Sequence, residues 1–309
     1  MTRTRATELG FGGQPLDQST ISVESCAVHG RLPDWLEGTL IRNGPGTFHV
    51  GDQRYRHWFD GLAMLHRFTI ADGRVSYANR FLESRSYDEA RDTGRIAYSE
   101  FATDPCRSMF ARVQSVFDTS VTDSAKVNVS RLDDRFIALA ETPIQVEFDP
   151  DTLRTVGVMQ HEESPYGRMT TVHPHTDPAT DDTYNLVTRF HASSEYRFYR
   201  STGDLAWERV AGQRVGQPSY IHSFGMSSRY LILVEYPLVV NPMALLLWLR
   251  PYIENFRWRP DRGARFVAID RVTGRRVRTW KTDAFFAFHH VNAFEDGGDL
   301  VVDLVAYPD

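Results

Sequence analysis

The sequence predicts an all-β protein of the propeller type. Short runs rich in valine, isoleucine, tyrosine and phenylalanine alternate with clusters of glycine, proline and aspartate, with little helical periodicity between them. The chain has 309 residues, whereas a β-sandwich needs only about 100. Many hairpins over this length favour a propeller, whose blades are four-stranded sheets.

The hairpins can be placed one by one along the chain. Each consists of a strand, a tight turn built from glycine, aspartate or proline, and a second strand. The expected turns lie at 71–73, 149–151, 201–204 and 270–274. No linker or low-complexity stretch separates them, so we expect one domain over residues 1–309.

One apolar segment, near 243–258, departs from this pattern. It begins with Met243-Ala-Leu-Leu-Leu-Trp-Leu249 and continues with aromatic and arginine residues, which predicts a short helical insertion. The insertion either packs on the propeller or forms a patch that contacts a membrane interface, where tryptophan and arginine favour the headgroup level.

Composition excludes several classes of protein. The net charge of −5 and the pI near 6.1 provide no basic field for nucleic acid. Cys26 and Cys106 are expected to be reduced thiols. We see no apolar signal-peptide core near the N-terminus, and the longest apolar run is far below the roughly 20 residues that span a bilayer. These features predict a cytoplasmic protein that contacts a membrane only peripherally.

Three of the eleven histidines stand in strand-like apolar or aromatic surroundings: His173, His222 and His289. Neutral imidazole is the commonest metal ligand, and a buried histidine needs partners for its ring nitrogens. Their separations are too long for a zinc finger or an HExxH helix. They suit ligands from separate blades that converge on an axis, although hydrogen-bonded core histidines would give the same pattern.

Several motifs occur in a defined order around these histidines. They are GRLPDWLEGTLIRNGPG at 30–46, HWFDG at 57–61, Thr122-Asp123, Val127-Asn128-Val129, Glu141-Thr142, His173-Pro174-His175, His222-Ser223-Phe224-Gly225, and Phe288-His289-His290-Val291-Asn292 with Glu295-Asp296. With them the chain resembles the carotenoid cleavage oxygenases from about Gly30 to its last residue. The animal branch, with the carotene oxygenases and the retinal pigment epithelium isomerohydrolase, is the most similar.

The resemblance implies a seven-bladed propeller with one Fe(II) ion held by four histidines. His173, His222 and His289 would be ligands, whereas His175 and His290 would not. Glu141 would accept a hydrogen bond from a ligand imidazole and so fix its tautomer. The fourth histidine is expected beyond residue 309, so we expect a C-terminally truncated domain with about four to five blades.

The activity implied is iron(II)-dependent oxidative cleavage of a carbon–carbon double bond in a carotenoid or apocarotenoid, with O2 as co-substrate and carbonyl products. No catalytic residue besides the metal ligands is assigned. Two alternatives within the family are an O2-independent retinyl-ester isomerohydrolase and a stilbene-cleaving dioxygenase. Two others are a zinc hydrolase and an inactive truncated propeller. The isolated 309-residue chain is expected to be poorly soluble and inactive, because an open ring exposes strand edges.

Overall fold

The structure is a computed structural model that describes residues 13–16, 18–105, 122–132, 134–159, 169–191, 193–203, 206–246 and 250–308. Strands dominate the described chain. The chain divides into two compact units. The first holds the described residues up to Ala140 together with Ile144–Met159, and the second holds Glu141–Pro143 and the described residues from 169 onward. The single domain expected over 1–309 stays a prediction.

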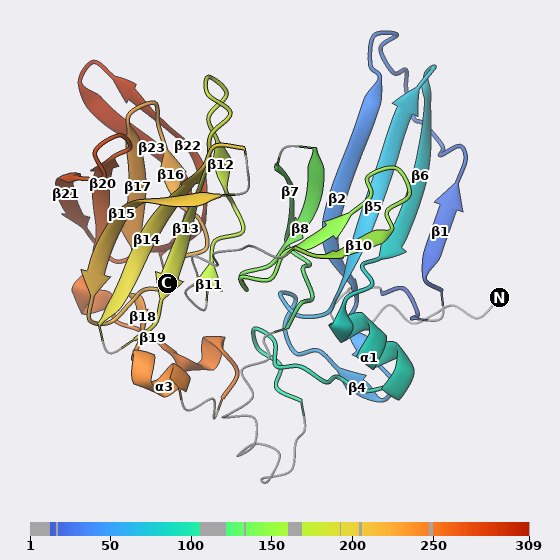
Figure 1. The fold of residues 1–309 in the computed structure, drawn as a ribbon, viewed down its shortest axis with the longest axis horizontal. Helices are drawn as coiled ribbons and strands as arrows, with labels where there is room; N and C mark the ends of the chain where they lie inside the picture. The colour runs from blue at the N-terminus through green and yellow to red at the C-terminus, as the bar shows by residue number, and fades with distance from the viewer. Residues whose placement is uncertain are drawn as a thin grey trace. The chain divides into compact units, whose positions relative to one another are not determined.

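The first unit contains two four-stranded antiparallel sheets with the orders β1-β6-β5-β2 and β10-β9-β8-β7 (Figure 1). The strands of the first sheet are β1 (Thr20–Val23), β2 (Gly38–Thr47), β5 (Leu62–Ala71) and β6 (Arg74–Phe81). Those of the second are β7 (Asn128–Leu132), β8 (Arg135–Leu139), β9 (Val146–Phe148) and β10 (Thr155–Val158). A small hairpin joins β3 (His49–Val50) to β4 (Gln53–Arg54).

Strand β5 is buried on both faces in its first half. Leu62 and Met64 lie in one core cluster, and Ala63 and Leu65 lie in a second. This division follows from the two-residue period of a strand, and it is typical of an inner strand covered on both sides. The second cluster also contains Phe148 of β9, so the two sheets share that core.

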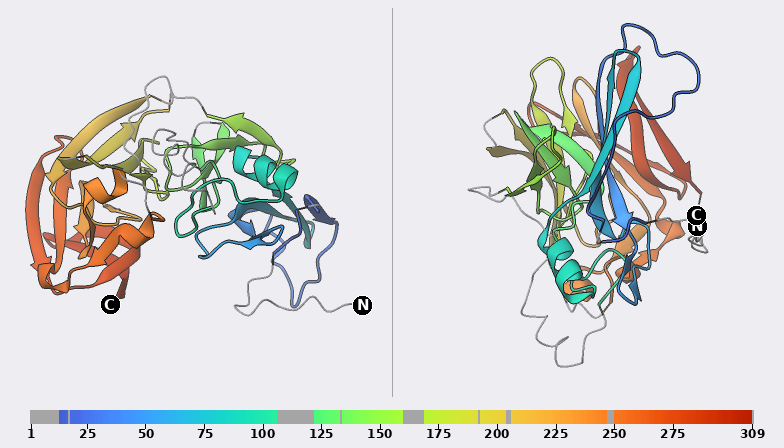
Figure 2. Two further views of the ribbon diagram at one scale, coloured as in Figure 1. Left: turned by 90° about the horizontal axis from the view of Figure 1, so that it is seen from below. Right: turned by 90° about the vertical axis from the view of Figure 1, so that its right-hand side faces the viewer.

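Helix α1 (Arg85–Thr93) follows the first sheet and contacts β5 (Figure 2). Its N-cap Ser84 accepts a hydrogen bond from the backbone N–H of Tyr87. The Asp123 carboxylate also accepts from the first backbone N–H groups, including that of Ser86 at 3.0 Å. A negative charge at a helix N-terminus stabilises the helix through its exposed N–H groups.

The second unit contains two larger antiparallel sheets. One has the order β11-β13-β14-β15 with β12 also paired to β13, and the other has the order β16-β17-β20-β21. Their strands are β11 (Met169–Thr170), β12 (His175–Thr176), β13 (Thr183–Arg189), β14 (Ser194–Ser201), β15 (Trp207–Val215), β16 (Gly225–Met226), β17 (Tyr230–Glu235), β20 (Ala264–Asp270) and β21 (Arg276–Thr282). A core cluster that includes Leu186, Phe198, Phe224, Leu233 and Val267 joins the two sheets.

Two further pairs of strands complete the second unit. They are β18 (Leu238–Val240) with β19 (Phe256–Trp258), and β22 (Phe286–Asp296) with β23 (Asp299–Tyr307). The short helical elements are α3 (Pro242–Leu246), η1 (Ile253–Asn255) and η2 (Pro260–Arg262). The helical insertion expected near 243–258 is therefore short, because its last three residues pair with β18 as a strand.

Three hairpin turns share one hydrogen-bond pattern, at 149–154, 177–182 and 270–275. In each, the N–H of the fifth residue donates to the carbonyl of the first, over 2.8, 2.8 and 2.9 Å respectively. The first residue is aspartate, and its carboxylate accepts from backbone N–H groups inside the turn. The fifth residues have left-handed φ angles, 58° at Leu153, 63° at Asp181 and 66° at Gly274. Turns were expected from the sequence at the first and the third of these places.

A substitution at Gly274 tests how closely the third turn packs against β15. A Cβ atom at this position would collide with the carbonyl oxygen of Val210 in β15. Gly274→Ala should therefore lower the free energy of unfolding by about 1–2 kcal/mol, through a left-handed φ and a backbone clash. Urea denaturation measures the change. Asp181→Ala is the control, because that position already carries a Cβ; an equal loss in both variants would contradict the packing argument.

Candidate metal centre

Three histidine rings meet in the second unit, each from a different segment. His173 lies just before β12, His222 just before β16, and His289 within β22. The ring centroids are 4.8 Å apart for His173 and His222, 4.9 Å for His173 and His289, and 5.0 Å for His222 and His289. One possible ligand atom from each ring lies within 4.8 Å of the other two. The structure thus brings together the three histidines that the sequence singles out.

The three rings differ in exposure. His222 is buried, His173 is half-buried, and His289 is exposed. The Nε2 atoms of His173 and His222 lie 3.0 Å apart. Two ring nitrogens at this distance either share a proton or direct their lone pairs at a common ligand.

Glu141 decides which nitrogen of His222 carries the proton. Its Oε1 atom accepts a hydrogen bond from Nδ1 of His222 at 2.6 Å and another from the Tyr220 hydroxyl at 2.5 Å. With its proton on Nδ1, His222 directs the Nε2 lone pair at His173. Glu141 therefore has the contact with a histidine that the resemblance implies for it.

The surroundings of His173 and His289 favour the neutral imidazole. Burial, followed by the neighbouring charges of His222, His289 and His175, lowers the pKa of His173 to about 3. Burial and then His222 also lower the pKa of His289. Neutral imidazoles keep lone pairs that can bind a metal.

Aromatic side chains pack around the Tyr220 ring and contact the ring of His222. Phe286 stacks on Tyr220 with ring centroids 6.0 Å apart, and Phe288 packs edge-on to His222 at 5.5 Å. Tyr252 and Phe256 lie 6.3 and 5.7 Å from Tyr220. Burial, with the charge of Glu141 next, raises the pKa of Tyr220 well above its usual value. The phenol therefore stays protonated and donates to Glu141.

His175 and His290 lie outside the group of three. Nε2 of His175 hydrogen-bonds to the carbonyl oxygen of Phe224 at 2.8 Å, and Nδ1 of His290 lies 2.9 Å from the Ser223 hydroxyl. Burial lowers the pKa of both rings, that of His290 to about 4. Both nitrogens therefore bond to the chain beside His222, in keeping with the exclusion of these histidines from the predicted ligand set.

Sequence reasoning missed Tyr220 and Ser223, whose side chains bond to the groups around the three rings. The only signal was their place next to His222 in the motif Ser219-Tyr220-Ile221-His222-Ser223. Which groups they reach depends on Glu141 and on β22, both distant in the sequence.

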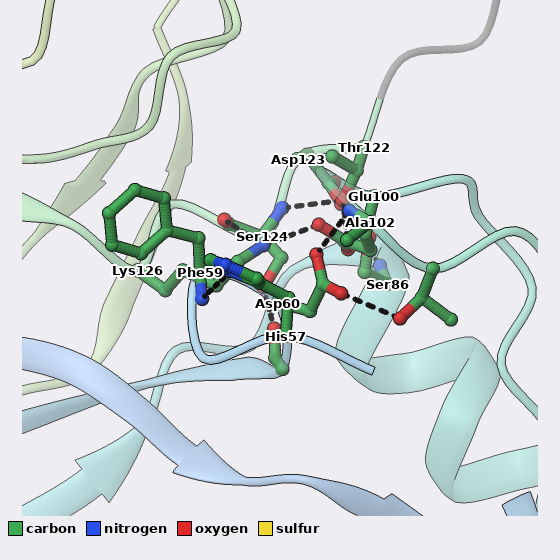
Figure 3. A network of polar contacts seen from close by, with 12 residues as sticks. His57, Phe59, Asp60, Ser86, Glu100, Ala102, Thr122, Asp123, Ser124 and Lys126 are labelled. Atoms are coloured by element: carbon green, nitrogen blue, oxygen red, sulfur yellow. Dashed lines mark hydrogen bonds and ion pairs between the residues drawn. The ribbon is translucent and has the colours of Figure 1, made fainter. Parts of the chain in front are cut away.

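A second polar cluster, in the first unit, gathers the motifs at 57–61 and 122–123 (Figure 3). Asp60 is fully buried and accepts from the Thr103 hydroxyl at 2.6 Å and from the backbone N–H of Ala102 at 3.1 Å. Lys126 donates to Glu100 at 2.5 Å in the same region. These hydrogen bonds join side-chain and backbone groups of the chain itself, so the cluster connects loops to one another.

Comparison with known proteins gives the family. The sequence profile of the retinal pigment epithelial membrane protein family matches residues 13–309. The chain belongs to this family. Curated relatives include the chicken (Gallus gallus) beta,beta-carotene 15,15'-dioxygenase, 33% identical over 91% of this chain and 59% of its own length. A carotenoid isomerooxygenase of Galleria mellonella is 34% identical, with 91% of this chain and 58% of that protein covered.

Solved members of the retinal pigment epithelial membrane protein family share the fold. A Synechocystis apocarotenoid oxygenase variant superposes with a TM-score of 0.83 at 26% identity, covering 96% of this chain and 62% of that one. A cobalt-substituted form of that oxygenase also has a TM-score of 0.83, at 26% identity, with 97% and 63% covered. The chain thus has the family's propeller fold, and it spans less than two thirds of the length of these relatives.

The three histidines suit the iron that the resemblance implies. Ligands on one metal with bonds of about 2.0–2.2 Å lie about 3–4 Å apart, and the His173–His222 contact of 3.0 Å has that separation. The limit of 4.8 Å for the whole group is wider than this separation, so the rings would have to approach one another for all three to bind one ion. A set of three imidazoles with a carboxylate behind one ring is a donor set that suits a divalent transition metal.

Proposed function

We propose that this chain contributes three ligands to the iron(II) centre of a carotenoid-cleaving enzyme. The observation that carries the proposal is the cluster of His173, His222 and His289 with Glu141 behind His222. Family membership and the activities for which the relatives are named, carotene dioxygenase and carotenoid isomerooxygenase, support the substrate class. The product pair would be two carbonyl compounds from one double bond and one O2.

The residues of the chain would bind the metal ion, orient its ligands and shield the site from water. The three imidazoles would hold the ion, and an iron(II) ion held there would supply the redox chemistry by which O2 cleaves a double bond. Glu141 would keep the His222 proton on Nδ1, away from the metal. Phe286 and Phe288 would exclude water from one side and offer an apolar surface to a polyene.

Product analysis tests this function. Residues 1–309 and the complete product of the gene that encodes them are loaded with Fe(II) under nitrogen and given a panel of carotenoids and apocarotenals with or without O2. We expect O2-dependent carbonyl products from the complete protein and none from residues 1–309. In the complete protein, His289→Ala should abolish cleavage, whereas His191→Ala, at an exposed histidine of the same unit, should not.

Other outcomes would select the alternatives. Conversion of a retinyl ester without O2 would favour an isomerohydrolase, and cleavage of phenolic stilbenes would favour a stilbene dioxygenase. Stoichiometric zinc with hydrolysis would favour a zinc enzyme. Tight Fe(II) binding with no conversion of any substrate by the complete protein would contradict the proposed activity.

Peripheral membrane contact through 243–258 and a cytoplasmic location are part of the proposal. Met243 is 52% exposed, whereas Leu245 and Phe256 are buried. The side chains of Leu246, Leu247 and Trp248, which the sequence analysis places in the patch, lie outside the described residues. No described helix has the length and apolar character needed to cross a membrane.

A further inference from the structure

Ser223 joins two of the histidine-bearing segments through one hydroxyl group. It follows His222 directly in the chain and is 4% exposed. Its Oγ atom donates to the carbonyl oxygen of Phe288 at 2.6 Å and accepts from the backbone N–H of His290 at 3.1 Å. These two partners flank His289, so the hydroxyl bonds to the chain on either side of it.

The same hydroxyl also fixes the ring of His290. Ser223 has one hydroxyl proton, and the short bond to Phe288 uses it. The contact of 2.9 Å between Oγ and Nδ1 of His290 must then be a bond donated by the ring. All three bonds at this oxygen therefore join the segment after His222 to residues 288–290 of β22.

The residues after Ser223 make the matching tie to the third histidine segment. The Phe224 carbonyl oxygen bonds to Nε2 of His175, two residues after His173. The backbone at Gly225 also passes close to His290, because a Cβ atom there would lie 3.3 Å from Cδ2 of that ring. The segment 222–225 is thus bonded to both other histidine-bearing segments.

We propose that Ser223 is a positioning residue that keeps the segments carrying His222 and His289 together, so that both rings can bind one metal ion. The inference rests on the metal centre proposed above. Within the described residues no hydrogen bond reaches the exposed His289 ring, so the hydrogen bonds of its chain neighbours help to position it. Without the hydroxyl, residues 288–290 would sample more positions. Metal binding would then include the loss of conformational entropy on ordering them, which weakens the affinity.

Ser227 provides a matched control in the same segment. It is 5% exposed, and its hydroxyl donates to Glu295 of β22 at 2.8 Å and accepts from the N–H of Tyr230 at 3.0 Å. It therefore joins the same two elements as Ser223, but at the end distant from the histidines. Loss of either hydroxyl removes buried hydrogen bonds, and only Ser223 lies beside the metal ligands.

The experiment compares metal affinity with stability in Ser223→Ala, Ser227→Ala and the unsubstituted complete protein. The dissociation constant for Co(II) is measured by competition with a chelator at fixed pH, and the unfolding midpoint is measured without metal. Ser223→Ala should weaken Co(II) binding by roughly 5- to 10-fold, the effect of one lost hydrogen bond on an equilibrium. Ser227→Ala should bind Co(II) as the unsubstituted protein does, with a similarly lowered midpoint.

Equal affinity in Ser223→Ala and the unsubstituted protein would overturn the inference, as would an equal loss in both variants. Failure of the unsubstituted protein to bind Co(II) would refute the metal centre itself. If Ser223→Ala does not fold, His290→Ala provides the second test, because it removes the ring bond and leaves the two backbone bonds. His290→Ala should also weaken Co(II) binding, and an unchanged affinity for Co(II) would refute the positioning role of Ser223.

Discussion

Replacing Lys126 with methionine is expected to lower the free energy of unfolding by about 3–5 kcal/mol. Lys126 and Glu100 form an ion pair at 2.5 Å whose side chains are 5% and 2% exposed. Glu100 also accepts from the Thr122 hydroxyl at 2.8 Å (Figure 3). Methionine would leave a buried carboxylate without its cation, and desolvation of an unpaired charge is costly.

Denaturant unfolding of the single and double variants measures this effect. Lys126→Met with Glu100→Gln should recover most of the loss, because no buried charge is left unpaired. Arg31→Ala, in an ion pair with Asp34 whose side chains are 83% and 84% exposed, should change stability by less than about 1 kcal/mol. A double variant no more stable than Lys126→Met would show that the ion pair is not the source of the loss.

The loss in Lys126→Met should also depend on pH. Burial raises the pKa of Glu100 above its ordinary value, and the ammonium of Lys126 opposes this. Without the ammonium the folded state favours the protonated carboxyl, so its stability falls as pH rises above the ordinary glutamate pKa. The variant should therefore lie closer to the unsubstituted protein at pH 5 than at pH 8.

Glu141→Gln is expected to weaken metal binding or activity by roughly 10–100-fold. The hydrogen bonds from Tyr220 and His222 both end on Oε1 of Glu141, so glutamine can keep an acceptor there and lose mainly the negative charge. Ligand basicity and the electrostatic support of a divalent cation fall with that charge. Chelator competition measures the affinity.

Tyr220→Phe is the control for the geometry of this carboxylate. It removes the phenol bond to Glu141 and keeps the charge, so its effect on the dissociation constant should be several-fold smaller. Unchanged affinity in Glu141→Gln would remove the role of Glu141 behind His222.

Much of the fold could be predicted because turn chemistry is local. The hairpin at Asp72 and Gly73 follows from two adjacent residues, and the structure has it where the sequence places it. The segment 243–258 shows the limit of such reasoning. Its apolar residues favour a helix, but Phe256 and its neighbours pair with β18 as a strand. Composition does not reveal this partner.

The site needed more than local pattern. Three histidines among apolar residues could also be hydrogen-bonded core residues. The resemblance supplied the assignment of His173, His222 and His289 as metal ligands. Ser223 carried no signal of its own, because the groups its hydroxyl reaches are brought near only by the fold. The fourth ligand expected beyond residue 309 stays a prediction.

The three turns that share one hydrogen-bond pattern are candidates for exchange between hairpins. The backbone hydrogen bonds that define each turn lie within six residues. The turn conformation therefore depends mainly on local sequence, and a turn could be moved from one blade to another. Two of the turns also contact each other, because Arg271 of the third turn forms an ion pair with Asp177 of the second. The fifth residues differ in their surroundings: Leu153 lies in the core, Asp181 is exposed, and a Cβ atom at Gly274 would meet a neighbouring backbone. A loop graft at these sites should therefore choose the fifth residue for its new neighbours, and a graft of the second or third turn should also preserve the ion pair between them.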